Sequence, residues 1–342
     1  MRLLSLTARV KLGLLVAAIG IGIAAPYLFG SFIVGLLSLA LIAGLFAMSI
    51  DLLAGYAGLV TLGQAGISAT AAYGVGYMAN KVGAGIPAQV LVGIAAGLVA
   101  SAIFAAMAMR TGGVYFIMIT LAQGMIVWGL SIRLYKITGA ENGLTGIERP
   151  SAISEYWQYY YFVLAVVLVC SFLLFIAVRS PFGSSIKGIR ESESRMRMLG
   201  YNPALQKVYV FMVSGFFASV AGILLVYLNG FISPFAAYIS ASAIGVLEAI
   251  LGGIGTLIGP MIGAFIIVYI QNIVSTNLER WPTLLGLIFI VVILFARQGL
   301  VGAVSTGWHR WLERRERVGP GDSAGDVADR PGDLSLESSE PR

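Results

Sequence analysis

The sequence contains few of the side chains on which catalysis and metal binding depend. It has one cysteine, one histidine and only 11% charged residues. Cys170 lies in an apolar run and His309 lies near the C-terminus, so there is no cluster of His and Cys to bind zinc and no Cys–His pair to act as a nucleophile. A single cysteine also cannot form a disulfide within the chain. These absences exclude most enzyme classes.

The chain also lacks the glycine-rich loop that binds phosphate in many nucleotide hydrolases. The pattern GxxxxGK[ST] is absent, and glycine followed by lysine does not occur anywhere in the sequence. In that loop the backbone N–H groups hold the phosphates and the lysine reaches the terminal ones. We therefore expect this chain to be no enzyme, to need no cofactor and to have no ATPase machinery of its own.

Long apolar runs dominate what is present. Hydrophobic residues make up 58% of the 342 positions, and 43 residues are glycine. Because a helix of about twenty apolar residues crosses the hydrocarbon core of a bilayer, the sequence predicts an all-α, polytopic membrane helical bundle. The predicted spans are about 10–29, 32–54, 62–80, 88–109, 112–132, 159–178, 208–228, 236–252, 258–276 and 282–298.

Two of these spans, at 62–80 and 236–252, are broken by glycines. Each of them either crosses the membrane or re-enters it, which leaves eight to ten crossings. If both termini face the cytoplasm, most of the 22 Lys and Arg residues fall in inner segments, as the positive-inside rule requires. We therefore expect a multi-pass protein of the cell (inner) membrane with cytoplasmic termini. The net charge of +6 does not indicate nucleic acid, because no basic soluble domain is present.

The domain organisation follows from these runs. We expect a cytoplasmic N-terminus at 1–9, a transmembrane domain at 10–298 and a cytoplasmic tail at 299–342. The end of the tail is rich in Gly, Asp, Ser and Pro, a composition that predicts mostly disordered chain.

One polar segment, residues 179–207, separates two long apolar runs. Its sequence predicts a single short helix of about four turns, capped by Ser184 or Ser185 and ended by Gly200. At about 100° per residue, four apolar side chains share one arc of this helix: Ile186, Ile189, Met196 and Leu199.

The charges of the polar segment leave two interpretations open. Glu191 precedes Arg195, and Glu193 precedes Arg197, at the i,i+4 spacing that stabilises an isolated helix. The segment is either a basic cytoplasmic loop whose charges only fix the topology, or a docking helix for a soluble partner.

A glycine-rich stretch, residues 55–74, is too polar for a plain lipid-facing helix. Non-helical backbone at membrane depth persists only where it is buried in protein or lines water. Four polar residues here are candidate lining residues of a translocation pathway: Thr61, Gln64, Ser68 and Tyr73. The alternative is close helix packing through small residues such as Gly63 and Gly66.

Two acidic residues fall at or near membrane depth, where an ionisable group is costly and often functional. Asp51 lies near the inner end of its span, where we expect it to reach water and to have a structural role. Glu248 is a further candidate for the translocation pathway, facing either the interior of the bundle or a partner subunit. With so few acids in the spans, an ion-coupled carrier is disfavoured.

Four motifs occur in order along the chain. They are DLLAGYAGLVTLGQAG from Asp51, TGGVYFIMITLA from Thr111, SPFGSSIKGIRESESRMRMLGYN from Ser180 and LGGIGTLIGPMIGA from Leu251. Together they resemble the permease subunits of branched-chain amino acid ABC importers, in the LivM-like branch, over about residues 35–299. Asp51 departs from the family pattern, which usually has Asn at this position.

The resemblance implies a permease that pairs with a second homologous permease, two cytoplasmic ATP-binding subunits and an external or periplasmic solute-binding protein. The coupling loop of the family corresponds to residues 184–200 of this chain. The residues of this loop that the resemblance places at the ATPase are Ser184, Arg190, Glu191, Glu193, Arg195 and the helix-ending Gly200.

The implied function is ATP-driven translocation of branched-chain, hydrophobic amino acids, with ATP hydrolysed by the separate subunits. Such a solute needs a mainly apolar path with a few hydroxyl and amide contacts. Two alternatives remain open: an ABC permease for urea or short amides, and, from another class, an ion-coupled carrier or channel that works without ATPase subunits.

Overall fold

The computed structural model describes residues 29–150 and 153–277, with isolated positions between 20 and 27 and between 283 and 290. The predicted spans 10–29 and 282–298 lie almost wholly outside these residues. The predicted termini, 1–9 and 299–342, lie outside them completely.

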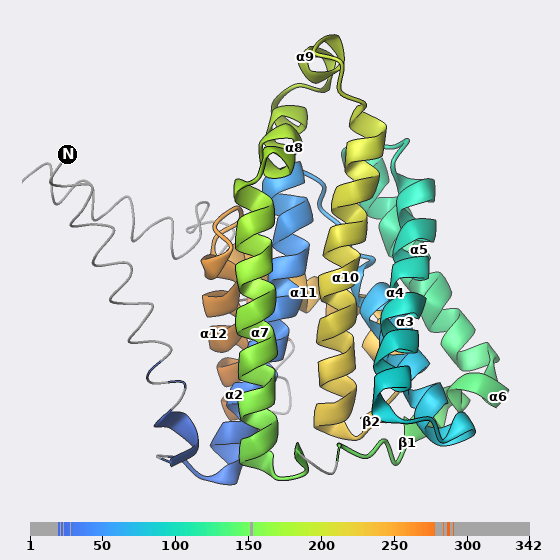
Figure 1. Cartoon of the computed structure of the whole chain (residues 1–342), viewed down its shortest axis with the longest axis vertical. Helices are drawn as coiled ribbons and strands as arrows, with labels where there is room; N and C mark the ends of the chain where they lie inside the picture. Colours follow the sequence, from blue (N-terminus) through green and yellow to red (C-terminus); the bar gives the residue numbers. More distant parts are fainter. Residues whose placement is uncertain are drawn as a thin grey trace, which may run out of the picture. The chain divides into compact units, whose positions relative to one another are not determined.

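Five helices of the described chain are long and apolar enough to cross a membrane (Figure 1). They are α2 (Ser31–Asp51, continued by a π-helical turn η1, Leu52–Ala57), α4 (Ile86–Ala108), α5 (Val114–Arg133), α7 (Tyr156–Arg179) and α10 (Pro203–Asn229). All five coincide with predicted spans, because each comes from an uninterrupted apolar run of at least about twenty residues. The predicted membrane helical bundle is confirmed.

Three apolar helices have non-helical backbone at one end or at both. They are α3 (Gln64–Tyr77, followed by the π-helical turn η2, Met78–Val82), α11 (Ile239–Gly252) and α12 (Ile258–Asn277). A helix of 14 residues, the length of α3 and α11, spans only about 21 Å. Glycines explain the breaks: Gly58, Gly253 and Gly255 have φ of 71°, 118° and 83°, in the left-handed region that other residues avoid.

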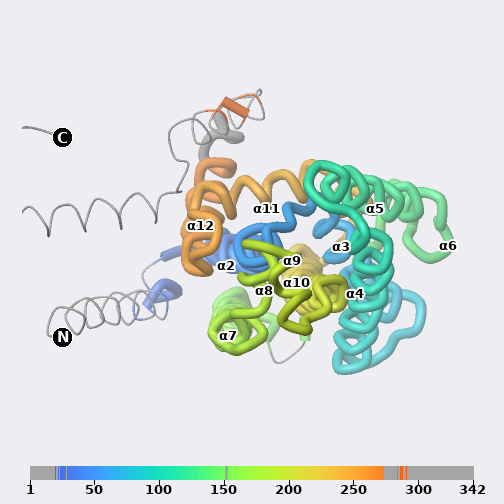
Figure 2. The backbone as a smooth tube through the Cα atoms, turned by 90° about the horizontal axis from the view of Figure 1, so that it is seen from above, coloured from blue at the N-terminus to red at the C-terminus, as the bar shows by residue number. Residues whose placement is uncertain are grey.

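Helix α2 lies at the centre of one group of helices, in contact with α7, α10, α11 and α12 (Figure 2). Helices α3 and α4 pack on the other side of α10. Small residues allow these approaches, since a Cβ added at Gly97 would overlap Ser219, and one added at Gly222 would overlap Ser68. The glycines of α3 pack in the same way, with Gly66 against Gly124 of α5.

The two ends of the bundle differ in structure. One end, here called the strand end, holds short elements between α5 and α7 and after α10, namely α6 (Tyr135–Thr138), η3 (Ala140–Asn142), β1 (Leu144–Thr145), β2 (Phe231–Ile232) and η5 (Pro234–Ala237). The strands pair antiparallel, with Leu144 opposite Ile232. The other end, here called the α8 end, holds α8 (Pro181–Glu191), α9 (Glu193–Met198) and the connection from α4 to α5 (Figure 1).

Candidate functional site

The first helix of the polar segment begins about one turn earlier than predicted. Ser180, rather than Ser184 or Ser185, caps α8: its Oγ accepts a hydrogen bond from Gly183 N at 3.4 Å, and Pro181 occupies the first helical position. Proline suits that position because its missing N–H would have no partner there. Gly183 is required by a close approach, since a Cβ at that position would overlap the backbone of Val178 at the end of α7.

The prediction of one continuous helix is wrong, because the segment forms two helices. Ser192 breaks them with an extended backbone, φ −162° and ψ 105°, and its Oγ accepts a hydrogen bond from Arg195 N at 3.4 Å as the N-cap of α9. A serine side chain competes with helical hydrogen bonding in this way. The break removes the register that the predicted Glu191–Arg195 pair needs.

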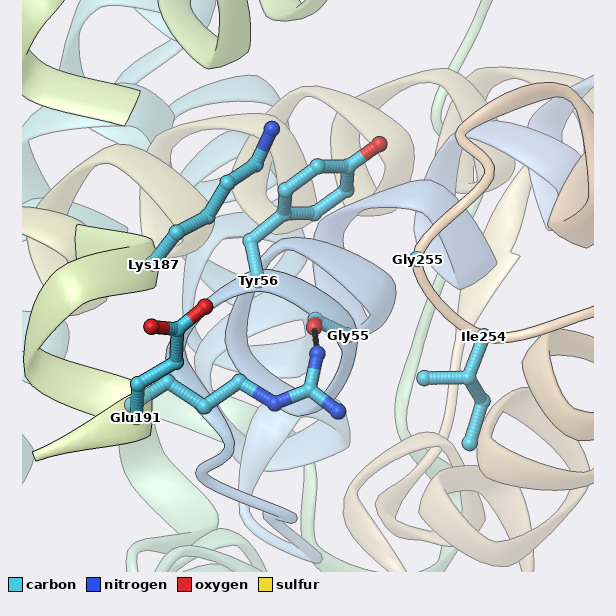
Figure 3. Close-up of a pocket in the computed structure, with 7 residues that line it drawn as sticks. Gly55, Tyr56, Lys187, Glu191, Ile254 and Gly255 are labelled. Atoms are coloured by element: carbon cyan, nitrogen blue, oxygen red, sulfur yellow. Dashed lines mark hydrogen bonds between the residues drawn. The ribbon is translucent and has the colours of Figure 1, made fainter. Parts of the chain in front are cut away.

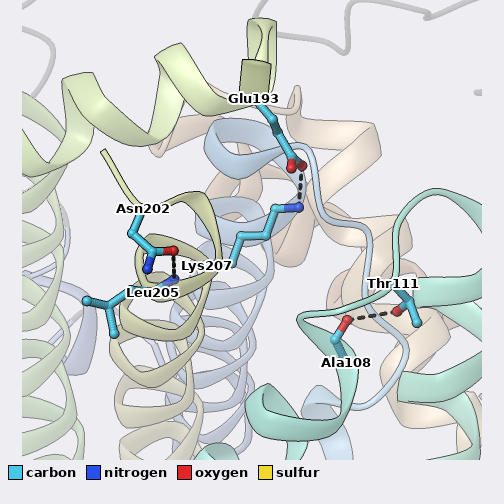
Figure 4. Close-up of polar contacts among 6 residues, drawn as sticks. All are labelled: Ala108, Thr111, Glu193, Asn202, Leu205 and Lys207. Atoms are coloured by element: carbon cyan, nitrogen blue, oxygen red, sulfur yellow. Dashed lines mark hydrogen bonds and ion pairs between the residues drawn. The ribbon is translucent and has the colours of Figure 1, made fainter. Parts of the chain in front are cut away.

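Glu193 is also not paired as predicted. Its carboxylate forms an ion pair with Lys207, in the first turns of α10, instead of with Arg197 (Figure 4). This pair joins the start of α9 to the start of α10. Because the Glu193 side chain is 46% exposed, the pair contributes little to stability and mainly fixes the position of α9.

Gly200 ends the helical part of the polar segment, as predicted. Gly200 has φ of 87°, its N–H bonds to Arg197 O at 3.0 Å, and Tyr201 N bonds to Met196 O at 3.1 Å. These two bonds satisfy the last carbonyls of α9 in the arrangement that a left-handed glycine allows. Asn202 then caps α10, accepting from Leu205 N at 3.3 Å (Figure 4).

The apolar arc of the polar segment is only partly buried. Ile186 and Ile189 are buried against the bundle, as predicted. Leu199 was placed on the same arc but is 72% exposed, and Met198 beside it is 81% exposed. The bend at Ser192 turns α9 away from the bundle, so its end presents two apolar side chains. Sequence periodicity missed this exposed tip because it assumed one straight helix.

Arg190 points into its own bundle. Its Nη1 donates a hydrogen bond to Gly55 O in η1, and its aliphatic stem packs on Gly58. The guanidinium forms part of the wall of a hollow of about 540 Å³ (Figure 3). Seven residues line this hollow: Gly55, Tyr56, Lys187, Arg190, Glu191, Ile254 and Gly255.

The other predicted site residues of the polar segment lie on its surface. Ser184 is exposed on α8 and its Oγ donates to Ser180 O at 3.4 Å. Glu191 is exposed and lines the hollow, opposite Ile254 and Gly255 (Figure 3). Arg195 is exposed on α9.

Asp51 does not reach water, contrary to the expectation from its position in the span. It is 0% exposed, and its carboxylate accepts hydrogen bonds from two backbone amides of the loop between α11 and α12. Gly255 N lies 2.6 Å from Oδ1 and Leu257 N lies 3.3 Å from Oδ2. A buried carboxylate needs such donors, and these come from a segment more than 200 positions away in the sequence.

The candidate pathway residues at the start of α3 and just before it lie in the packed interior. Thr61 and Gln64 are both 0% exposed. Gln64 Nε2 donates to Ser214 Oγ of α10, and Ser214 Oγ donates to Ser49 O of α2 at 2.6 Å. Gln64 Oε1 has no hydrogen-bond partner within the described residues. The amide in the membrane interior is thus half satisfied by neighbouring helices.

Further along α3, Ser68 is half-buried where α3 crosses Gly222 of α10, and Tyr73 is buried with its hydroxyl near Ser131 of α5. Glu248 of α11 is 2% exposed, so its side chain lies in the interior of this chain. This burial favours the interior of the bundle over a partner subunit as its surroundings. None of these five pathway candidates lines the hollow beside Arg190.

Sequence reasoning missed the hydroxyls that hold the start of α3. Ser242 Oγ of α11 accepts from Ala65 N at 3.0 Å, and Thr120 Oγ1 of α5 accepts from Leu62 N at 3.2 Å. These amides would otherwise be unsatisfied at a helix start inside the bundle. The only signal in the sequence was the presence of single hydroxyl residues within apolar runs.

Comparison with known proteins gives the family. A family model described as "Branched-chain amino acid transport system / permease component" matches residues 32–297, from α2 through α12 and beyond. The "High-affinity branched-chain amino acid transport system permease protein LivM" of Escherichia coli K12 is 26% identical, over 84% of this chain and 74% of the relative.

Two further relatives, which match shorter parts of the chain, are named for different solutes. The permease protein LivH of the same branched-chain system of E. coli K12 is 25% identical over 51% of this chain and 61% of its own length. The "Xylose transport system permease protein XylH" of E. coli K12 is 32% identical over 32% of this chain and 29% of its own. No solved structure matches the chain. With most of its length matched by the family model, this multi-pass membrane protein belongs to the family of permease components of branched-chain amino acid transport systems.

Proposed function

We propose that this chain is the permease subunit of an ABC importer that moves branched-chain, hydrophobic amino acids across the cell membrane. Energy comes from ATP hydrolysis by two separate cytoplasmic subunits. The LivM and LivH relatives, both named for the same transport system, support a second homologous permease as its partner. An external solute-binding protein delivers the solute.

The observation that carries this proposal is the polar segment itself. Two short helices extend beyond the ends of α7 and α10, and the Met198–Leu199 tip is 81% and 72% exposed. Two exposed apolar side chains surrounded by charge are typical of a surface that binds a protein partner. We place this tip at a groove of the ATPase, with Arg195 and Glu193 at its rim. The α8 end then faces the cytoplasm, and both termini of the chain lie there as well.

In this proposal the structure corresponds to a closed state, in which the candidate pathway residues are not yet open to the solute. Thr61, Gln64 and Glu248 are packed in the interior here, so they line a path only after the helices around α3 separate. Gln64 Oε1, which has no partner within the described residues, is the group of α3 best suited to contact the solute's ammonium.

Reconstitution into vesicles tests the function. The purified chain is inserted with its second permease, and the ATPase and the binding protein are added on opposite sides. Labelled leucine should accumulate only when ATP and ATPase are both present. Uptake of leucine by vesicles that lack the ATPase would contradict the proposal in favour of a channel or carrier. Retention of urea or xylose instead of leucine by the binding protein would contradict the solute class but not the architecture.

A double substitution tests the role of the polar segment. Glu191→Ala with Glu193→Ala should leave expression and membrane insertion intact, because both side chains are exposed. Uptake should fall at least about tenfold, the effect of losing one or two charged contacts with a partner. Glu141→Ala, an exposed acid at the strand end, is the matched control and should keep normal uptake. Normal uptake in the double variant would refute the role of these two acids.

A further inference from the structure

Three segments that are far apart in the sequence meet at the α8 end of α2. They are η1, which continues α2, helix α8 of the polar segment, and the loop 253–257 between α11 and α12. Asp51 and Gly55 contact the loop, while Arg190 of α8 donates to Gly55 and also attracts the Asp51 carboxylate. The same short turn therefore touches both the polar segment and the loop.

The contact with Arg190 follows from the chemistry of a helix end. The last carbonyls of a helix have no partner within the helix and carry its negative dipole end. Gly55 is in the last turn of η1, which ends when Gly58 adopts the left-handed conformation. Arg190 supplies both a donor and a positive charge to this carbonyl, so it stabilises the end of α2 from a different helix.

The contact with the loop is tighter and more deeply buried. The loop carries Gly253, Gly255 and the non-glycine Leu257, all with positive φ, and the amides of Gly255 and Leu257 both point toward Asp51. A Cβ at Gly55 would lie 2.5 Å from Gly255 N and would overlap the Asp51 carboxylate. Asp51 and Gly55 therefore form a fixed joint between α2 and the loop.

The two contacts differ in how easily they open. Asp51 is 0% exposed, so breaking its bonds would leave an ionisable group buried without partners. Arg190 is exposed and lies on the wall of the hollow, where water can replace Gly55 O as its acceptor. The bonds to the loop are thus permanent, whereas the Arg190 bond can be released while Lys187 and the buried Ile186 and Ile189 keep α8 packed on the bundle.

We infer that Asp51, Gly55 and Arg190 form a latch that passes movement of α8 to the α11–α12 loop. This inference rests on the proposed function, in which the ATPase moves the polar segment. Asp51 and Arg190 act as positioning residues. When Arg190 holds Gly55, the polar segment, α2 and the loop move together; when it lets go, the remaining contacts of α8 pass on less of the movement.

The first test measures coupling in the assembled complex. Arg190→Gln should leave ATP hydrolysis within about twofold of the normal rate while uptake falls about tenfold, which raises the ATP consumed per solute about fivefold to twentyfold. Lys187→Gln is the matched control: Lys187 lines the same hollow but lies over the Tyr56 ring, 5.2 Å from its centre, and should keep the normal ratio. Arg190→Lys, which keeps the charge, should restore part of the coupling. An unchanged ratio in Arg190→Gln, or parallel loss of hydrolysis and uptake, would overturn the latch.

The second test does not depend on transport. With Cys170→Ser as background, spin labels are placed on the complex at Ser184→Cys on α8 and Ile254→Cys in the loop, both exposed positions. The distance between the labels should have one narrow distribution, which Arg190→Gln broadens and Lys187→Gln does not. Equal distributions in all three backgrounds would overturn the latch. A third outcome separates the two proposals. If Arg190→Gln broadens the distance distribution but the unsubstituted complex shows no ATP-dependent uptake, the proposed function is refuted and the latch is not.

Discussion

Two arginines at opposite ends of the bundle bind the same kind of group in different surroundings. At the strand end, Arg149 donates from Nε to Tyr227 O at 2.9 Å and from Nη2 to Leu228 O at 2.7 Å, near the end of α10. Its guanidinium also stacks 4.7 Å from the centre of the Tyr159 ring. At the α8 end, Arg190 donates to the single carbonyl of Gly55 beside an open hollow.

The difference indicates which end is built to move. Arg149 is half-buried and has three contacts, so it fastens the connection before α7 permanently to α10. Arg190 is exposed and has one such bond besides its attraction to Asp51, so its release costs less than that of Arg149. A rigid strand end and a releasable α8 end suit a permease that receives its energy at one end only.

The largest effect on stability is expected at the α8 end, where Gly55 lies very close to Asp51 and Gly255. Gly55→Val should destabilise the folded chain by at least about 3 kcal/mol, because its side chain would collide with the Asp51 carboxylate and the Gly255 backbone. The matched control is Gly35→Val, also on α2, where nothing lies within 4 Å of an added Cβ. Heating detergent extracts and measuring the remaining monodisperse protein by size-exclusion chromatography compares the two. Equal thermal stability would show that η1 and the loop are not in tight contact.

A smaller effect is expected at the strand end. Arg149→Ala should destabilise the chain by about 1–3 kcal/mol, since it leaves two carbonyls of α10 without their donor and removes the ring contact. The same heating assay applies. Arg133→Ala, near the same end of the bundle, is the control, and no ion pair of Arg133 is found among the described residues. A loss no larger than that of the control would remove the contrast between the two arginines.

The smallest effect on stability is expected for Arg190→Ala. The exposed single bond should be worth less than about 1 kcal/mol, because water replaces Arg190 as the partner of Gly55 O. Chemical or thermal unfolding in the same detergent gives the comparison with Arg149→Ala. If Arg190→Ala destabilised the chain as much as Arg149→Ala, Arg190 would be a permanent brace and the α8 end would be as rigid as the strand end.

Much of the fold could be predicted from the sequence because the bilayer imposes a simple rule. Runs of about twenty apolar residues gave α4, α5, α7 and α10 with errors of a few residues at their ends. Glycines marked the interrupted segments around α3 and α11 for the same reason that they break helices elsewhere. The end of α9 at Gly200 was predictable, since that signal is local.

The candidate site was less predictable, because its contacts are not local. The break at Ser192 depends on a side chain that competes with helical bonding, and periodicity does not detect it. Asp51 could be identified as costly in a span, but its donors at Gly255 and Leu257 lie more than 200 positions away. Arg190 was predicted to face the ATPase from its place in the polar segment, and only the packing of α8 on η1 showed that it binds Gly55.

The central claim is that the polar segment is where a cytoplasmic ATPase drives this permease. The most direct measurement is crosslinking in living cells with a photoreactive amino acid at Leu199, which is 72% exposed, and in parallel at Phe231 of β2, which is 47% exposed. We predict that Leu199 forms an adduct with the cytoplasmic ATP-binding subunit and that Phe231 does not. An adduct of Leu199 with an external protein, or of Phe231 with the ATPase, would contradict the account.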